Sequence, residues 1–296
     1  MIGRKIVPAL VFLLFAVATV VATAQPAEQR PNPDANKGQF LRLVRNDKKT
    51  PTALEAAIVR LVLRDDKGQE VTVDLVSAVH VAEKSYYQRL NREFRDYDVV
   101  LYELVAPEGT RVPKGGGDRR SAVSMLQGGM KDVLELEFQL EQIDYTRKNM
   151  VHADMSPEQF AKSMKDRDES MFTMFLRMWG YAIAKQYSGS GGAGDLQLLA
   201  AFFDKNRALA LKRVMAEQFE DMEGSLVALE GPDGSTLISE RNKVALEVLR
   251  KQIDAGKRKI AIFYGAGHMP DFQTRLGDQF GLVPQSTRWL VAWNLK

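Results

Sequence analysis

Two histidines and one glutamate stand at or just beyond the ends of three apolar segments that are far apart in the chain. They are His80, Glu103 and His268. Imidazole nitrogens and a carboxylate oxygen form a common three-ligand set for a catalytic divalent metal ion that keeps an open position for water. An ion held in this way lowers the pKa of its bound water and polarises a carbonyl group, which is the chemistry of hydrolysis.

The segments before these residues have the composition of β-strands. Residues 58–63 and 71–76 lie on either side of Asp65-Asp66-Lys67-Gly68, and this pattern predicts a β-hairpin. Residues 98–105 and 259–264 are apolar runs typical of central strands that are covered on both faces. In open α/β sheets, ligands collect in the crevice at the carboxyl ends of the strands. Parallel, adjacent strands would therefore bring the three side chains together.

Each of the three side chains also has a plainer interpretation. A single histidine after a strand is usually a hydrogen-bonded residue of the core or its rim. Glu103 is the acid that interrupts an apolar run, so its burial is costly unless it binds a metal or pairs with a buried arginine. Gly265 and Gly267 allow a sharp turn and a close backbone approach before His268. Taken together the three indicate a site, because perturbed groups gather in functional clefts.

Arg241 and His152 are further candidates. Arg241 shares the inner stripe of a predicted helix with Val244 and Val248. A buried guanidinium needs a negative partner, so Arg241 would either steady a developing oxyanion or form a structural salt bridge. His152 lies just before a helix whose start is marked by a capping box at Ser156. It would serve as a fourth ligand or proton shuttle, or contact the backbone as an ordinary loop histidine.

The remaining pattern predicts a mixed α/β (α+β) fold with a central sheet built from both chain ends. An all-helical insertion is expected at about residues 121–224, between the two halves of the sheet. The ordered domain is expected over residues 53–296, after a flexible tether at 25–52 that is rich in Pro, Asn, Gln and charge. Helices are also predicted over 83–94, over 238–255 with Gly256 at its end, and from 271, before a last strand over 288–293.

Residues 1–24 have the three parts of a cleavable secretory signal peptide. Arg4 and Lys5 precede an apolar stretch at residues 6–21, and Ala22-Thr23-Ala24 forms the small-x-small pattern before a cut at Gln25. The stretch is shorter than the roughly 20 residues that a membrane-spanning helix needs, although an uncleaved N-terminal anchor is the alternative. We therefore expect an exported protein, periplasmic or extracellular, without a stable membrane span after cleavage.

Composition excludes several classes of protein. Loss of the predicted signal peptide lowers the formal net charge from +3 to +1, and the basic clusters are short, so nucleic acid is not an expected partner. The absence of cysteine excludes a disulfide framework and thiolate catalysis. The chain also lacks His-Glu-x-x-His, Gly-x-Ser-x-Gly and a dinucleotide fingerprint, which argues against zincin proteases, serine hydrolases and Rossmann oxidoreductases.

Four motifs, in this order, resemble those of the TraB/GumN family. They are Ser77-Ala78-Val79-His80, Tyr102-Glu103, Glu240-Arg241-Asn242-Lys243 and Tyr264-Gly265-Ala266-Gly267-His268-Met269-Pro270. The family belongs to one superfamily with the Tiki metalloproteases and the haem-binding ChaN-like proteins, and its hallmark is two Gly-x-x-His motifs with a strand-borne Glu between them. The second motif is intact, whereas Ser77 stands where the first has Gly. The resemblance covers about residues 56–105 and 236–295.

The resemblance implies that His80, Glu103 and His268 are metal ligands or catalytic residues, with Arg241 near them. It implies a divalent ion, such as Zn, Mn, Co or Fe, and a hydrolase acting on peptide or ester bonds of a peptide or small-molecule substrate. Glu103 would either ligate the ion or act as general base. The ChaN-like relatives imply an alternative, a non-catalytic protein that binds haem or a metal. Ser77 in place of Gly leaves open a decayed site with a purely interactive role.

Overall fold

A computed structural model of the chain describes residues 39–64, 68–107, 109–110, 112–115, 134–170, 197, 200–230 and 234–296. The predicted signal peptide, the first half of the predicted tether, and residues 121–133 and 171–196 of the predicted insertion lie outside these ranges. Within them, none of the helices combines the length and the apolar composition that crossing a membrane requires.

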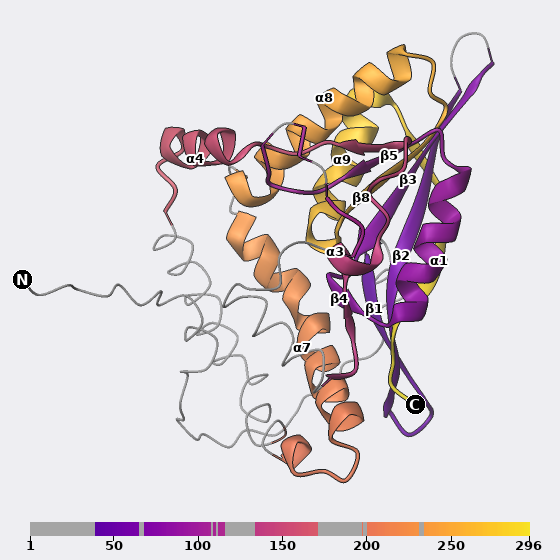
Figure 1. Cartoon of the computed structure of the whole chain (residues 1–296), viewed down its shortest axis with the longest axis vertical. Helices are drawn as coiled ribbons and strands as arrows, with labels where there is room; N and C mark the ends of the chain where they lie inside the picture. Colours follow the sequence, from indigo (N-terminus) through magenta and orange to yellow (C-terminus); the bar gives the residue numbers. More distant parts are fainter. Residues whose placement is uncertain are drawn as a thin grey trace, which may run out of the picture.

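The described chain forms a central seven-stranded mixed sheet to which both halves of the chain contribute (Figure 1). The strand order is β1-β2-β3-β8-β5-β7, and β9 also pairs with β2. The strands of this sheet are β1 (Leu41–Arg45), β2 (Pro51–Arg64), β3 (Glu70–Ala78), β5 (Val99–Tyr102), β7 (Met150–His152), β8 (Lys259–Gly265) and β9 (Val283–Asn294). Two further strands, β4 (Val81–Ala82) and β6 (Glu137–Phe138), pair with each other. The predicted α/β class is confirmed.

The strands that lead to the candidate residues lie at the centre of this sheet. β2 and β3 form the predicted hairpin, in which Ile58 lies opposite Val76. β3 and β5 both run parallel to β8, which lies between them. Beyond Lys259, β8 is buried along its whole length, as expected for a central strand covered on both faces.

Helices cover both faces of the sheet. Phe263 and Tyr264 are consecutive in β8, so their side chains point to opposite faces. Phe263 packs edge-to-face on Phe94, which follows α1, whereas Tyr264 packs on Phe272 of α9. α1 and α9 therefore lie on opposite faces, with α8 beside α9 (Figure 1). Among the described residues, the α-helices are α1 (Lys84–Glu93), α3 (Gln139–Gln142), α4 (Pro157–Asp166), α7 (Arg207–Glu230), α8 (Arg241–Asp254) and α9 (Met269–Phe280).

Two helix ends form as their sequences predict. Oγ of Ser156 accepts a hydrogen bond from the N–H of Gln159 at 3.2 Å, and Oε1 of Gln159 accepts one from the N–H of Ser156 at 2.8 Å, so a capping box begins α4. Gly256, with φ of 86°, ends α8 in the left-handed conformation that favours glycine. A π-helical turn at Thr236–Glu240 leads into α8 and so into Arg241.

Two predicted boundaries are wrong. β1 lies inside residues 25–52, and its pairing with β2 makes this part of the predicted tether an ordered edge of the sheet. Phe40, Leu41 and Leu43 are buried, and this apolar alternation outweighs the polar composition around it. The insertion at 121–224 is not all helical, because it contains β6 and β7, and β7 pairs with β5. A strand of two or three residues is too short to show a periodicity in the sequence.

Candidate active site

His80, Glu103 and His268 meet at one edge of the sheet. Each follows shortly after the carboxyl end of its strand, β3, β5 or β8. Because the three strands are parallel and adjacent in the order β3-β8-β5, their ends lie at the same edge. The structure therefore brings together the three side chains that the sequence proposes as ligands.

Gly265 lies directly beneath this group. A Cβ on Gly265 would stand 3.1 Å from Nε2 of His80 and 3.3 Å from Oε2 of Glu103, both closer than ordinary van der Waals contact. The N–H of Gly265 donates a hydrogen bond to the same Oε2 of Glu103 at 2.7 Å. The glycine thus gives room to two functional side chains and fixes one of them through its backbone.

Glu103 is a buried carboxylate that stays ionised. Its Oε1 accepts a hydrogen bond from Arg241 at 2.7 Å and lies 3.6 Å from Nε2 of His268. Burial alone would raise the pKa of Glu103, but interactions with His268, Arg241 and His80 outweigh it and lower the pKa to about 2. The predicted need of this acid for a partner is met by an arginine.

Arg241 is held between two carboxylates. Its Nε and one Nη donate to Asp154 at 2.9 and 2.6 Å, and the same Nη donates to Glu103. The other Nη makes longer contacts, 3.3 Å to the carbonyl of Leu237 and 3.4 Å to Nε2 of His268. Burial alone would lower the pKa of Arg241, but its hydrogen bonds and ion pairs raise it above the ordinary value. Arg241 is therefore a permanent buried cation with one weakly engaged donor group.

The proton on His268 can be assigned from its neighbours. The amide nitrogen of Asn242 donates to the backbone oxygen of His268 at 3.0 Å and to Asp271 at 2.8 Å, both of which only accept. The amide oxygen of Asn242 therefore faces Nδ1 of His268, at 2.7 Å, and Nδ1 carries the proton. Burial lowers the pKa of His268 to about 4, so the ring is neutral and Nε2 presents a lone pair toward Glu103.

His80 is the solvent-exposed member of the group. Its Nδ1 lies 3.0 Å from Oε1 of Gln139, whose amide nitrogen donates to the hydroxyl of Tyr145 at 2.8 Å. The backbone N–H of Gln139 also donates to the carbonyl of His80 at 2.9 Å. Gln139 thus holds both the backbone and the ring of His80, with Nδ1 as donor and Nε2 turned to the group.

The structure does not bring His152 into the group. Its Nε2 lies 2.5 Å from the carbonyl oxygen of Leu104, and its ring packs on Tyr102, the residue opposite it in the β5–β7 pair. Tyr102 and Glu103 are consecutive in an extended segment, so they point to opposite sides. Of the interpretations that the sequence left open, the backbone contact describes His152.

Sequence reasoning missed Asp154, Gln139 and the role of Asn242. Asp154 sits after β7, beside Ala153, whose carbonyl accepts a hydrogen bond from the buried hydroxyl of Tyr264. The signal for Asp154 was indirect, because a buried arginine requires a carboxylate without saying which one. Gln139 carries no local signal, since its partner His80 lies far away in the chain.

Ser77, which stands in place of the motif glycine, is accommodated in β3. It is 1% exposed and lies opposite Tyr264 of β8. Its Oγ has no hydrogen-bond partner in the described part of the chain, which is unfavourable for a buried hydroxyl. The strand therefore tolerates the serine without using its hydroxyl.

The donor atoms of this group suit a divalent metal ion, but the side chains are not arranged around a common point for one. Two imidazoles and one ionised carboxylate match the donors that divalent transition metals prefer. Within the residues that the structure describes, however, no three His, Asp or Glu side chains are arranged as a metal-binding group. Both carboxylate oxygens of Glu103 already accept hydrogen bonds, Oε1 from Arg241 and Oε2 from the Gly265 N–H.

No protein-family model matches this chain, and neither a curated protein nor a solved structure matches it significantly. The resemblance of its motifs to the TraB/GumN family stays a prediction. The residues of those motifs, His80, Glu103, Arg241 and His268, are the ones that the fold places together.

Proposed function

We propose that the chain is an exported hydrolase of the TraB/GumN type, which uses a divalent metal ion and acts on peptide or ester bonds. The observation that carries the proposal is the meeting of two imidazoles, one ionised carboxylate and one buried guanidinium at the carboxyl edge of parallel strands. Such an edge is where open α/β sheets place their ligands.

His80, Glu103 and His268 would hold the ion, which is Zn, Mn, Co or Fe by the preferences of these donors. When bound, the ion would supply a water of lowered pKa and polarise the scissile carbonyl. A cation and Arg241 compete for the same carboxylate, so metal affinity depends on how firmly Asp154 retains the guanidinium.

The protein's own groups have separate roles in this proposal. His80 is accessible and its Nε2 has no hydrogen-bond donor among the described residues, so this atom can offer its lone pair to the ion. The weakly engaged Nη of Arg241 can donate to an oxyanion as negative charge develops. Burial of the guanidinium strengthens that interaction, because little water screens it.

Elemental analysis of the purified chain tests the metal proposal. We expect close to one divalent ion per chain in the wild type and a loss in His80→Ala, whose exposed position keeps the fold intact. His152→Ala removes an imidazole outside the group and is the matched control, which should keep its metal. Hydrolysis of a p-nitrophenyl ester and of a casein peptide should disappear with a chelator and in His80→Ala. Equal metal content in wild type and His80→Ala would refute the proposal.

The same variants distinguish the alternative of a non-catalytic haem or metal binder. The wild type is titrated with haem and compared with His80→Ala. A Soret band that is lost in His80→Ala, together with an absence of metal-dependent hydrolysis, would favour a haem-binding protein over a hydrolase. Export is tested separately, by mass spectrometry of the protein recovered outside the cytoplasm. Its first residue should be Gln25.

A further inference from the structure

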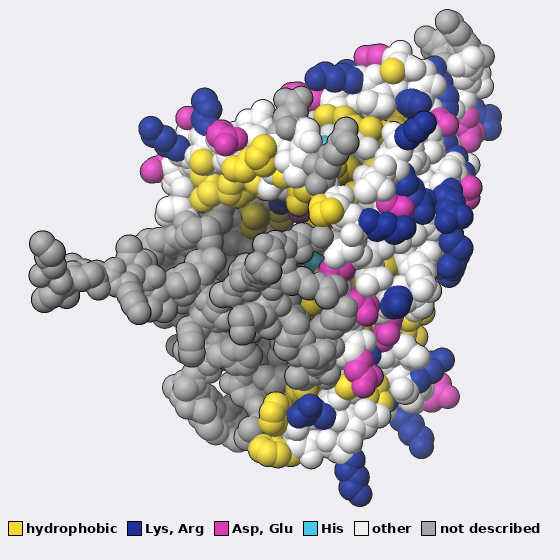
Figure 2. Space-filling model, in the orientation of Figure 1, with side chains coloured by type: hydrophobic (Ala, Val, Ile, Leu, Met, Phe, Trp, Pro, Cys, Tyr) yellow, Lys and Arg dark blue, Asp and Glu magenta, His cyan; other side chains and the backbone are white. Residues whose placement is uncertain are grey.

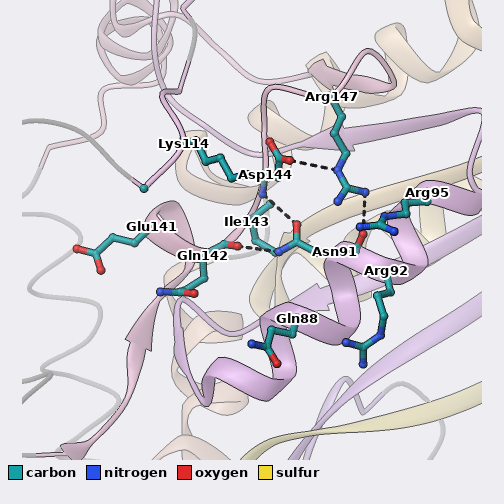
Figure 3. Close-up of a pocket in the computed structure, with 11 residues that line it drawn as sticks. Gln88, Asn91, Arg92, Arg95, Lys114, Glu141, Gln142, Ile143, Asp144 and Arg147 are labelled. Carbon is teal, nitrogen blue, oxygen red and sulfur yellow. Dashed lines mark hydrogen bonds and ion pairs between the residues drawn. The ribbon is translucent and has the colours of Figure 1, made fainter.

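A cavity lies away from the candidate active site, between α1 and the segment 141–147 (Figure 3). Its volume is about 650 Å³, and it is lined by none of the active-site side chains. Arg92 and Arg95 come from the end of α1 and the turn after it, and Arg147 faces them from the other wall. Lys114 completes the basic lining.

The positive charge of this cavity is only partly neutralised. Its acidic lining residues are Glu141 and Asp144, and Asp144 is already paired with Arg147 at 3.5 Å. Arg92 and Arg95 are exposed and form no ion pair with any residue that the structure describes. Figure 2 shows Lys and Arg side chains along the edge of the molecule where α1 lies. Unpaired guanidinium groups of like charge around one cavity repel each other unless an anion joins them.

The walls of the cavity are held in place by hydrogen bonds. The side chain of Asn91 donates to the carbonyl of Gln142 at 2.7 Å and accepts from the N–H of Asp144 at 3.0 Å. Arg147 donates to the backbone oxygen of Asn91 at 2.7 Å, which ties the second wall to α1 (Figure 3). Ile143, 1% exposed, anchors the same segment in the core. The cavity is therefore pre-formed, and a ligand need not order these walls on binding.

We propose that this cavity binds a small anion that carries phosphate or carboxylate oxygens. The planar guanidinium group pairs with either kind of oxyanion through two parallel hydrogen bonds. The lining is mostly polar, so an apolar ligand finds little surface to bury. Because the cavity is open to water and salt, a dissociation constant on the order of 0.1 to 1 mM is expected.

Isothermal titration of the full chain with inorganic phosphate, and separately with citrate, tests this proposal at an ionic strength held constant with NaCl. Arg92→Gln and Arg95→Gln should each weaken binding about fivefold, because each removes one charged donor. Lys84→Gln is the control, since it removes one exposed charge from the same helix but not from the cavity. Binding of phosphate alone would identify a phosphate site, and binding of citrate alone a carboxylate site.

Two results would overturn the proposal. One is that neither phosphate nor citrate gives a heat of binding larger than the heat measured with NaCl. The other is equal affinity in the wild type, Arg92→Gln and Arg95→Gln. His80→Ala should bind the anion as the wild type does, so failure of the hydrolase proposal leaves this one standing, and the reverse also holds.

Discussion

Arg241 donates a hydrogen bond to Glu103 at 2.7 Å, and the side chains of both residues are buried, at 7% and 13% exposure. The pair explains how an acid can stand at the end of an otherwise apolar strand. Arg241 carries a permanent positive charge, and its ion pair is one of the interactions that keep the Glu103 carboxylate ionised. Glu103, Arg241 and Asp154 thus form a buried ion-pair network, and a ligand that binds Glu103 must compete with Arg241 for it.

Arg241→Met should destabilise the fold strongly. The substitution leaves the carboxylates of Glu103 and Asp154 buried without their cation, which costs on the order of 3 to 5 kcal/mol. The free energy of unfolding in urea measures this loss. Lys243→Met, on the same helix, breaks a surface pair with Glu240 and should change stability by less than about 1 kcal/mol. A similar small effect in Arg241→Met would contradict the buried-network description.

Stability should fall as the pH drops from 6.5 toward 5. The pKa of His268 is about 4 in the folded protein against an ordinary value of 6.5, so the unfolded chain binds the additional proton in this window. One such group lowers the free energy of unfolding by about 1.5 kcal/mol between pH 6.5 and 5. Glu103, with a pKa of about 2, acts in the same direction but only below its ordinary value of 4.5.

Urea unfolding curves of His268→Gln should lose most of this pH dependence. His152→Gln removes a histidine outside the group and should retain the slope of the wild type. If both variants keep the slope of the wild type, the pH dependence belongs to other residues and His268 is not a buried neutral ring.

Gly265→Ala should impair the site more than the fold. The new Cβ would press on Nε2 of His80 and Oε2 of Glu103, and the exposed His80 ring can move away at a cost of about 1 to 2 kcal/mol. Metal content and ester hydrolysis should fall at least tenfold, because disturbing the orientation of metal ligands usually weakens metal binding by that much or more. Gly277→Ala in α9 is the matched control, because its Cβ meets nothing closer than 3.9 Å and a helical alanine stabilises by about 0.5 to 1 kcal/mol.

Ser77→Ala should stabilise the protein by about 1 kcal/mol. The buried Oγ of Ser77 has no hydrogen-bond partner among the described residues, so its removal relieves a desolvation cost. Ser77→Gly, which restores the motif residue, should gain less, because glycine in a strand loses more backbone entropy on folding. A decrease in the urea midpoint of Ser77→Ala would show that the hydroxyl has a role that these contacts do not reveal.

The sequence predicted the centre of the fold better than its margins. The long apolar runs that became β3, β5 and β8 carry a strong local signal, and parallel packing follows from their burial on both faces. β7 has only three residues, and the apolar alternation of β1 stands in a polar stretch, so each is recognised as a strand by its pairing, with β5 and β2 respectively. Local composition cannot report such pairing.

For the site, residue type identified the ligands but not what surrounds them. Histidines are few and each could be considered singly, whereas Asp154 and Gln139 belong to common residue types. Their importance comes from contacts with Arg241 and His80 across long stretches of chain. The competition between Arg241 and a metal ion for Glu103 likewise appears only when distances are known.

The stretch from Gln139 to Arg147 touches His80 at its beginning and frames the basic cavity at its end. A ligand that shifts one end of this hydrogen-bonded stretch would also shift the other end. By thermodynamic reciprocity, an anion in the cavity would change the affinity of His80 for its own ligand by a certain factor. That ligand would change the affinity of the cavity for the anion by the same factor. Communication between the two places would need no movement of the sheet.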